Sequence, residues 1–222
     1  VVYPLVSELW AKKDLRRLTA GLVLWYKYAF VLLIPVVGIL FLFSGVFLSL
    51  FFGPAYATGA MALQILLAGT IFYLVASLNS HTLTAIGQAK RVTVIIFLAA
   101  VINVLLNVLL IPRYSIEGAA VATLVSYLFI FLASTWTIRK YLPLHPPLFQ
   151  WGKIMFSAAL FLLLSYQLNL VLPLPPLFRA LVAISSGLMM YIILIFAVGI
   201  IDMKEMKKYT TLVIRREVQK DD

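Results

Sequence analysis

The stretch Val92–Ile111, which reads VTVIIFLAAVINVLLNVLLI, contains no charged residue and only three polar ones. A helix that crosses a bilayer needs about 20 consecutive, predominantly apolar residues to span the hydrocarbon core. This stretch therefore predicts one transmembrane helix, and it indicates the class of fold for the whole chain.

Five further apolar stretches of similar length accompany it, and glycine or proline marks the gaps between them. Hydrophobic residues make up 64% of the 222 residues and charged residues 12%, whereas a soluble domain carries about 25% charged residues. The sequence thus predicts an all-α integral membrane protein of about six transmembrane helices and excludes a water-soluble globular domain. The six stretches are Tyr28–Leu50, Met61–Ile86, Val92–Ile111, Gly118–Ile138, Ile154–Leu172 and Leu177–Ile201.

The basic residues predict the orientation of these helices. With the N-terminal segment in the cytoplasm, 16 of the 18 lysines and arginines fall on that side, and only Arg113 and Arg179 fall outside. Cytoplasmic loops of membrane proteins carry such an excess. We therefore expect a multi-pass protein in the cytoplasmic membrane of a prokaryote, with both ends of this chain in the cytoplasm. The net charge of +10 then needs no nucleic-acid partner, because the aromatic side chains that stack bases are not interleaved with the basic clusters.

The start of the chain, Val1-Val2-Tyr3-Pro4, has neither an initiating methionine nor the charged segment of a signal peptide. It reads as the end of a helix whose beginning is missing. The regions we expect are the end of a preceding helix and a cytoplasmic loop (1–23), a four-helix part of a transporter lobe (24–140), two additional transmembrane helices (141–201) and a basic cytoplasmic tail (202–222).

Three motifs follow one another in a specific order: LFFGPAY at residues 50–56, LTAIGQAK at 83–90 and NVLLNVLLIPRYSIEGAAVAT at 103–123. This succession resembles the C-terminal half of the Wzx-type polysaccharide flippases, which export O-antigen and teichoic acid precursors. They share a superfamily with the lipid II flippases and the MATE multidrug exporters. Ser115 departs from the pattern, since these proteins usually have glycine there. The resemblance implies the C-terminal lobe, plus two extra helices, of a MATE/lipid II flippase-like fold.

The function that the resemblance implies is the flipping of lipid-linked oligosaccharide or polysaccharide precursors across the membrane. Its partners would be the lipid-linked glycan, the membrane lipids and the missing N-terminal lobe of the same protein. A fragment of a MATE-like multidrug exporter is an alternative, which acidic residues in the missing lobe would favour. A non-transporting truncated gene product, or a membrane scaffold for synthesis enzymes, is another.

An enzyme is disfavoured by the residues that the chain lacks. It contains no cysteine and two distant histidines, too few for the three protein ligands of a catalytic zinc site. No glycine-rich phosphate-binding loop occurs. We therefore predict no catalytic residue, no metal site and no cofactor.

Polar side chains inside the spans are the candidate site residues, because lipid penalises them: Gln64, Asn79, His81, Asn103 and Asn107. Either they face a hydrated cavity and contact a sugar or diphosphate headgroup, or they hydrogen-bond to neighbouring helices and interfacial water. Asn103 and Asn107, four residues apart, share one helix face. No charged residue lies near the middle of a predicted span. Lys27 and Glu117 are expected at the boundaries of two different spans, Tyr28–Leu50 and Gly118–Ile138.

Overall fold

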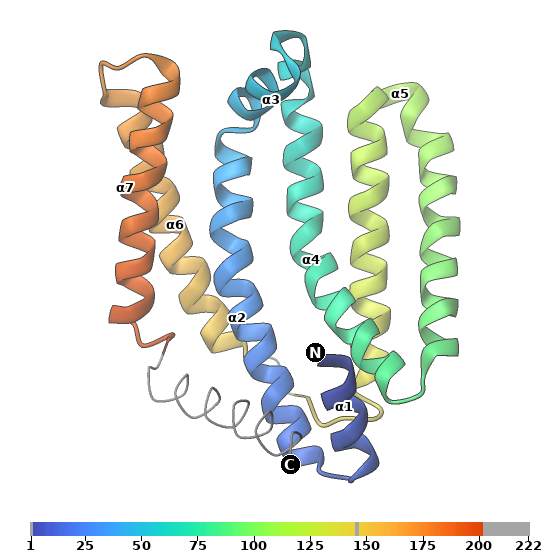
Figure 1. Ribbon diagram of the computed structural model, residues 1–222. Coiled ribbons are helices and arrows are strands. Elements are labelled where there is room, and N and C mark those ends of the chain that lie inside the picture. The colour runs from blue at the N-terminus through green and yellow to red at the C-terminus, as the bar shows by residue number, and fades with distance from the viewer. Residues whose placement is uncertain (1, 145–146, 202–222) are drawn as a thin grey trace, which may run out of the picture. The chain divides into compact units, whose positions relative to one another are not determined.

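The computed structural model describes residues 2–144 and 147–201, and every element in this part of the chain is helical (Figure 1). The chain divides into two compact units, Val1–Leu148 and Phe149–Asp222, each described here by itself. The first unit holds α1 (Val2–Ala11), α2 (Leu15–Leu42), α3 (Ser44–Phe52), η1 (Pro54–Gly59), α4 (Ala60–Ala85) and α5 (Ala89–Ile138). The second holds α6 (Leu148–Val171), which begins at the boundary, and α7 (Pro176–Ala197). The all-α membrane fold predicted from the sequence is confirmed.

Five segments of the described chain are long and apolar enough to cross a membrane: α2, η1 with α4, α5, α6 and most of α7. The α5 helix has 50 residues, more than one crossing needs, and its regular backbone is interrupted at Ser115 (φ 50°, ψ −128°). Figure 1 shows its two arms folded back beside each other. The arms match the predicted stretches Val92–Ile111 and Gly118–Ile138, while the number of six crossings stays a prediction.

The α5 hairpin depends on a close approach of backbone to backbone. A Cβ atom on Gly118 would lie 2.6 Å from the carbonyl oxygen of Leu110, so only glycine fits there. Ser115 has a positive φ, which glycine adopts without steric cost. This position is the one at which the Wzx-type pattern has glycine, so the serine keeps the turn at the cost of some backbone strain.

The first predicted stretch, Tyr28–Leu50, was misplaced at both ends. The helix begins at Leu15, where the Asp14 carboxylate accepts a hydrogen bond from the Arg17 backbone N–H (3.1 Å), and it ends at Leu42. Phe43 separates it from the short α3 helix. The loop expected up to residue 23 is therefore shorter: only residues 12–14, between α1 and α2, lie outside a helix.

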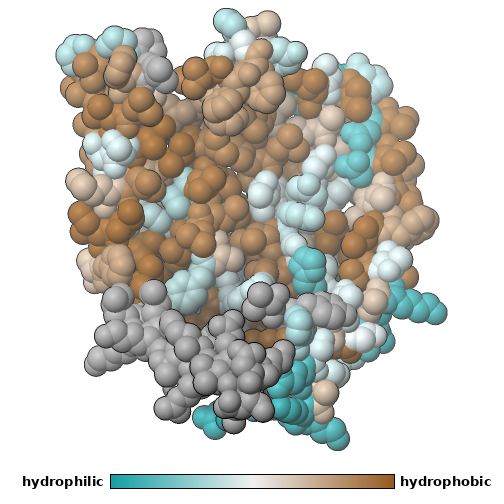
Figure 2. Space-filling model, in the orientation of Figure 1, coloured by the Kyte–Doolittle hydropathy of each residue, from teal (hydrophilic) through white to brown (hydrophobic). Residues whose placement is uncertain are grey.

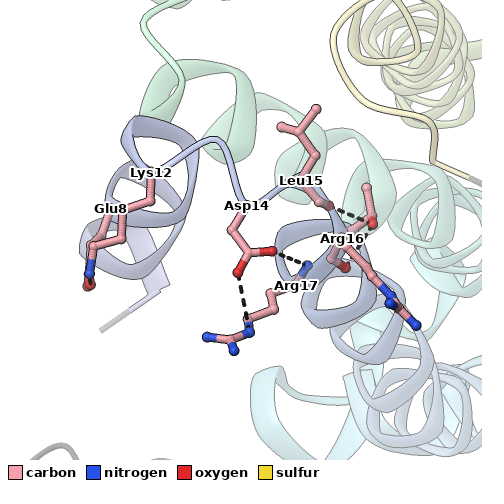
Figure 3. A network of polar contacts seen from close by, with 7 residues as sticks. Glu8, Lys12, Asp14, Leu15, Arg16 and Arg17 are labelled. Atoms are coloured by element: carbon pink, nitrogen blue, oxygen red, sulfur yellow. Dashed lines mark hydrogen bonds and ion pairs between the residues drawn. The ribbon is translucent and has the colours of Figure 1, made fainter.

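Charged residues at this turn hid the start of α2 in the sequence. Asp14 also pairs with the Arg17 guanidinium at 3.2 Å, and Glu8 pairs with Lys12 at 2.7 Å (Figure 3). These exposed pairs contribute at most about 0.5 kcal/mol each. The helix is held by its other face, where Leu18 is buried.

The earlier start of α2 corrects the expectation that Lys27 is a boundary residue. Lys27 is the thirteenth of the 28 residues of α2, and only 6% of its surface is exposed. Its ammonium group lies 5.4 Å from the centroid of the Tyr28 ring. A lysine is therefore buried inside the first membrane-spanning candidate, where the sequence had predicted no charge.

Packing within each unit relies on small residues, as in other membrane bundles. In the first unit Gly69 of α4 approaches Tyr127 and Leu124 of α5, and an added Cβ would lie 3.2 Å from the Tyr127 ring. In the second unit the Ser165 hydroxyl donates to the Ala183 carbonyl (3.0 Å), and Gly187 faces Ser165 and Phe161. The predicted tail at 202–222 lies outside the described residues.

Candidate functional site on the α4 helix

Asn79 joins three helices on the buried face of α4. Its side-chain oxygen accepts a hydrogen bond from the Tyr26 hydroxyl of α2. Its amide nitrogen donates to the hydroxyls of Ser134 (3.2 Å) and Thr135 (3.0 Å) on α5. Only 2% of the Asn79 surface is exposed. Of the two alternatives considered for Asn79, this geometry matches hydrogen bonding to neighbouring helices.

The opposite side of α4 carries a different set of polar residues. They recur every three or four positions, and such spacing places them along one side of a helix. Asn79, with its buried neighbours Val75, Ala76 and Leu83, occupies the other side. We call this set the α4 polar face; it consists of Thr70, Tyr73, Ser77, His81 and Thr84.

Two members of the α4 polar face present polar atoms outward. Tyr73 is 44% exposed and His81 is also exposed, and neither side chain hydrogen-bonds to another described residue. By contrast, Thr70 and Thr84 donate to carbonyls of their own helix, at 3.0 and 2.8 Å. A free hydroxyl and imidazole on a spanning helix are costly against lipid. Their exposure therefore favours a hydrated surface on this side of α4.

An aromatic pair extends the polar face from α4 to the second arm of α5. The rings of Tyr73 and Tyr127 lie 4.5 Å apart, inclined by 31°. Figure 2 shows pale, more polar residues among the brown ones over α4. Tyrosine offers an apolar ring and a polar tip, and such a surface suits a ligand that is itself amphipathic.

The remaining candidates lie elsewhere in the first unit. The Gln64 amide donates to the Phe41 carbonyl (3.1 Å) and the Ser44 hydroxyl (3.2 Å), and it thereby bridges the break between α2 and α3. On the first arm of α5, Asn107 donates to Asn103 (2.9 Å), and the Asn107 side-chain oxygen is buried without a partner among the described residues. Of the five candidates, only His81 belongs to the α4 polar face. A role in substrate binding stays a prediction for all five.

Sequence reasoning missed Thr70, Tyr73, Ser77 and Tyr127. Hydroxyl-bearing side chains are common in membrane helices, so they stand out less in the sequence than amides and imidazoles. The regular spacing of the α4 residues was the signal that could have found the face. Tyr127 could not have been found this way, because its relation to Tyr73 depends on how α5 folds back against α4.

Comparison with known proteins assigns the chain to a family. The family model "Lipid II flippase MurJ" matches residues 1–192. The chain belongs to the MurJ family. The family model describes a membrane flippase, so the coarse prediction of a flippase family is confirmed. Membership in the Wzx branch of the superfamily is not shown.

Two archaeal proteins are similar in sequence to part of this chain. The membrane protein MJ1068 of Methanocaldococcus jannaschii is 32% identical over 142 residues, which cover 64% of this chain and 28% of that protein. The "probable low-salt glycan biosynthesis flippase Agl15" of Haloferax volcanii is 30% identical over 129 residues, which cover 57% of this chain and 27% of that protein. The matched region thus spans about a quarter of the length of each relative.

A solved structure shares the fold. The lipid II flippase MurJ in its inward closed conformation superposes with a TM-score of 0.73 at 19% sequence identity, covering 87% of this chain and 41% of that one. At this identity the likeness shows the MurJ-like fold alone.

Proposed function

We propose that the chain is the C-terminal portion of a transporter that flips lipid-linked oligosaccharide or polysaccharide precursors across the cytoplasmic membrane. The α4 polar face carries the proposal: a helix that spans the membrane packs one side against its neighbours and leaves hydroxyl and imidazole groups on the other. A hydrated path through the membrane explains such a face. The MurJ family match and the glycan flippase among the relatives support the substrate class.

The substrate itself explains why such a face is needed. A lipid-linked glycan carries a sugar headgroup that cannot cross the apolar core of about 30 Å unaided. The hydroxyl and imidazole groups of the face can replace water at the sugar hydroxyls, while the Tyr73–Tyr127 pair packs against the less polar faces of the sugar ring. In the proposed cycle, a second lobe closes this face alternately toward the two sides of the membrane.

Reconstitution of the whole transporter tests the proposal. Vesicles that contain the purified protein and a lipid-linked oligosaccharide are treated with an enzyme that modifies only headgroups on the outer surface. We expect the protein to expose headgroups from the inner leaflet, so that modification passes the half reached in protein-free vesicles. If modification stops at half while the same vesicles exchange a cationic dye, a multidrug exporter replaces this proposal.

The proposed topology, with both ends of the chain in the cytoplasm, predicts opposite thiol accessibility at the two ends of α2. Residues 1–222 hold no cysteine, so an introduced thiol is the only one among them, and any cysteine elsewhere in the transporter is first replaced by serine. In intact cells we expect Tyr56→Cys, at an exposed position in η1, to react with a membrane-impermeant maleimide. Lys13→Cys, at the turn before α2, should react only after permeabilisation. The reverse pattern would contradict the topology.

A further inference from the structure

A small cavity lies where the two ends of the α5 hairpin come together. Its volume is about 400 Å³, and its lining comes from the α4–α5 turn and both arms of α5: Gln88, Lys90, Arg91, Val94, Ile95 and Thr137. We call it the hairpin cavity. All of its residues belong to the first compact unit, and none belongs to the α4 polar face.

Positive charge gathers around the hairpin cavity. Lys90 and Arg91 begin the first arm of α5, and Arg139 and Lys140 follow the end of the second arm; all four are exposed. Because α4 and the second arm of α5 end here while the first arm begins here, the helix dipoles largely offset one another and the positive charge comes from the side chains. An anion at this end of the hairpin would meet several cations at once.

The acidic residues of the described chain do not neutralise this charge. There are three of them, and Glu8 and Asp14 are engaged by Lys12 and Arg17 at the α1–α2 turn. The third, Glu117, lies next to the fold of the α5 hairpin, at its opposite end. The cations at the cavity thus lack a described carboxylate partner.

Aromatic contacts hold the basic side chains at the cavity. The Arg91 guanidinium lies 5.4 Å from the centroid of the Tyr141 ring, and the Tyr141 hydroxyl donates to the Gln88 side chain at 2.9 Å. The Lys140 ammonium lies 3.2 Å from the centroid of the Trp136 ring. Cation–π contacts of this kind restrict long side chains without neutralising them. Two of the four basic side chains thus lie against aromatic rings and not against a described carboxylate.

The cavity lies at the end of the α5 hairpin, where we expect the surface of the membrane. Trp136 is 66% exposed, and exposed tryptophans concentrate at the headgroup level of bilayers. Toward the middle of the hairpin the cavity wall is aliphatic, formed by Val94 and Ile95. The cavity thus has a cationic mouth and an apolar wall, which matches a molecule with an anionic head and a hydrocarbon tail.

We propose that the hairpin cavity binds an anionic phospholipid of the membrane. Its phosphate pairs with Lys90 and Arg91, and the first part of one acyl chain lies along Val94 and Ile95. Basic pockets between transmembrane helices on the cytoplasmic side recognise such headgroups. This site is separate from the α4 polar face and does not depend on the transported substrate.

Native mass spectrometry and thermal unfolding of the full protein test the site. With phosphatidylglycerol as the probe, we expect retained lipid and a higher unfolding temperature, and with phosphatidylcholine neither. The double variant Lys90→Gln/Arg91→Gln should bind phosphatidylglycerol about thirtyfold more weakly, because each basic residue near the membrane surface contributes about 1 kcal/mol of attraction. Its unfolding temperature without lipid should equal that of the wild type.

The matched control is Lys13→Gln/Arg16→Gln, which removes the same charge from exposed positions outside the cavity. It should bind phosphatidylglycerol as the wild type does. Equal weakening in both double variants would overturn the proposal, since attraction would then follow net charge alone. Full stabilisation by inorganic phosphate, or equal binding of phosphatidylcholine, would overturn it as well.

Discussion

Replacing Asn79 by leucine should lower the free energy of unfolding of the first unit by about 2 kcal/mol. Leucine has the same branched shape but removes the acceptor for Tyr26 and the donors to Ser134 and Thr135. Interhelical hydrogen bonds in membrane proteins average about 0.6 kcal/mol each and reach about 1.7 kcal/mol. A buried polar group that loses its partner costs about 1–3 kcal/mol. Three contacts on two neighbouring helices therefore add up to a large effect for one residue.

Thermal unfolding of the purified protein measures this effect, and a double-mutant cycle separates the Asn79 contact from general damage. Tyr26→Phe removes one hydroxyl and leaves the ring. If the Tyr26–Asn79 bond contributes as proposed, the double variant should be more stable than the sum of the two single losses indicates. The matched control is His81→Leu, on the opposite side of α4 and exposed. If Asn79→Leu and His81→Leu had the same unfolding temperature, Asn79 would not be the structural link between α2, α4 and α5.

The membrane fold could be predicted because lipid imposes two simple conditions. A spanning helix must be long and apolar, and both arms of α5 satisfy this condition in the sequence alone. Gly118 and Pro112 marked the place where the arms separate. The sequence could not show that a Cβ at Gly118 would touch the backbone at Leu110, because that contact exists only once the hairpin has closed.

The start of α2 could not be predicted from hydropathy, since its first turns have two different sides. Arg16 and Arg17 face outward, while Leu18 and Leu22 are buried against the rest of the unit. A window average mixes the two sides and reads the segment as a loop. The same error placed Lys27 at a boundary, although the helix carries it inside. A helical periodicity test over residues 15–27 would have shown the apolar side.

The candidate site was only partly predictable, because polarity in a span does not say which way a side chain points. Asn79 and His81 are two residues apart in the sequence and lie on opposite sides of α4. One is buried between three helices and the other is exposed. Gln64 reaches the end of α2, a role that depends on the break at Phe43. Spacing along α4 finds the polar face, but only the packed structure separates it from the structural amides.

Replacing Tyr73 by leucine should reduce transport by at least tenfold while changing the unfolding temperature little. Leucine is well tolerated at an exposed position of a membrane helix. However, it removes both the ring that stacks on Tyr127 and the free hydroxyl. A contact of about 1.4 kcal/mol with the moving headgroup corresponds to a factor of ten in rate. The measurement is the initial rate of headgroup exposure in the vesicle assay, at equal amounts of reconstituted protein.

Two further variants tell substrate contact from altered packing. Tyr73→Phe keeps the ring and loses the hydroxyl, so an intermediate rate would divide the effect between stacking and hydrogen bonding. Phe97→Leu is the matched control, because it also removes an exposed aromatic ring, from the first arm of α5, and lies outside the α4 polar face. It should transport as the wild type does. If Tyr73→Leu flips at the wild-type rate, or if Phe97→Leu is equally slow, the α4 polar face does not line the path of the headgroup.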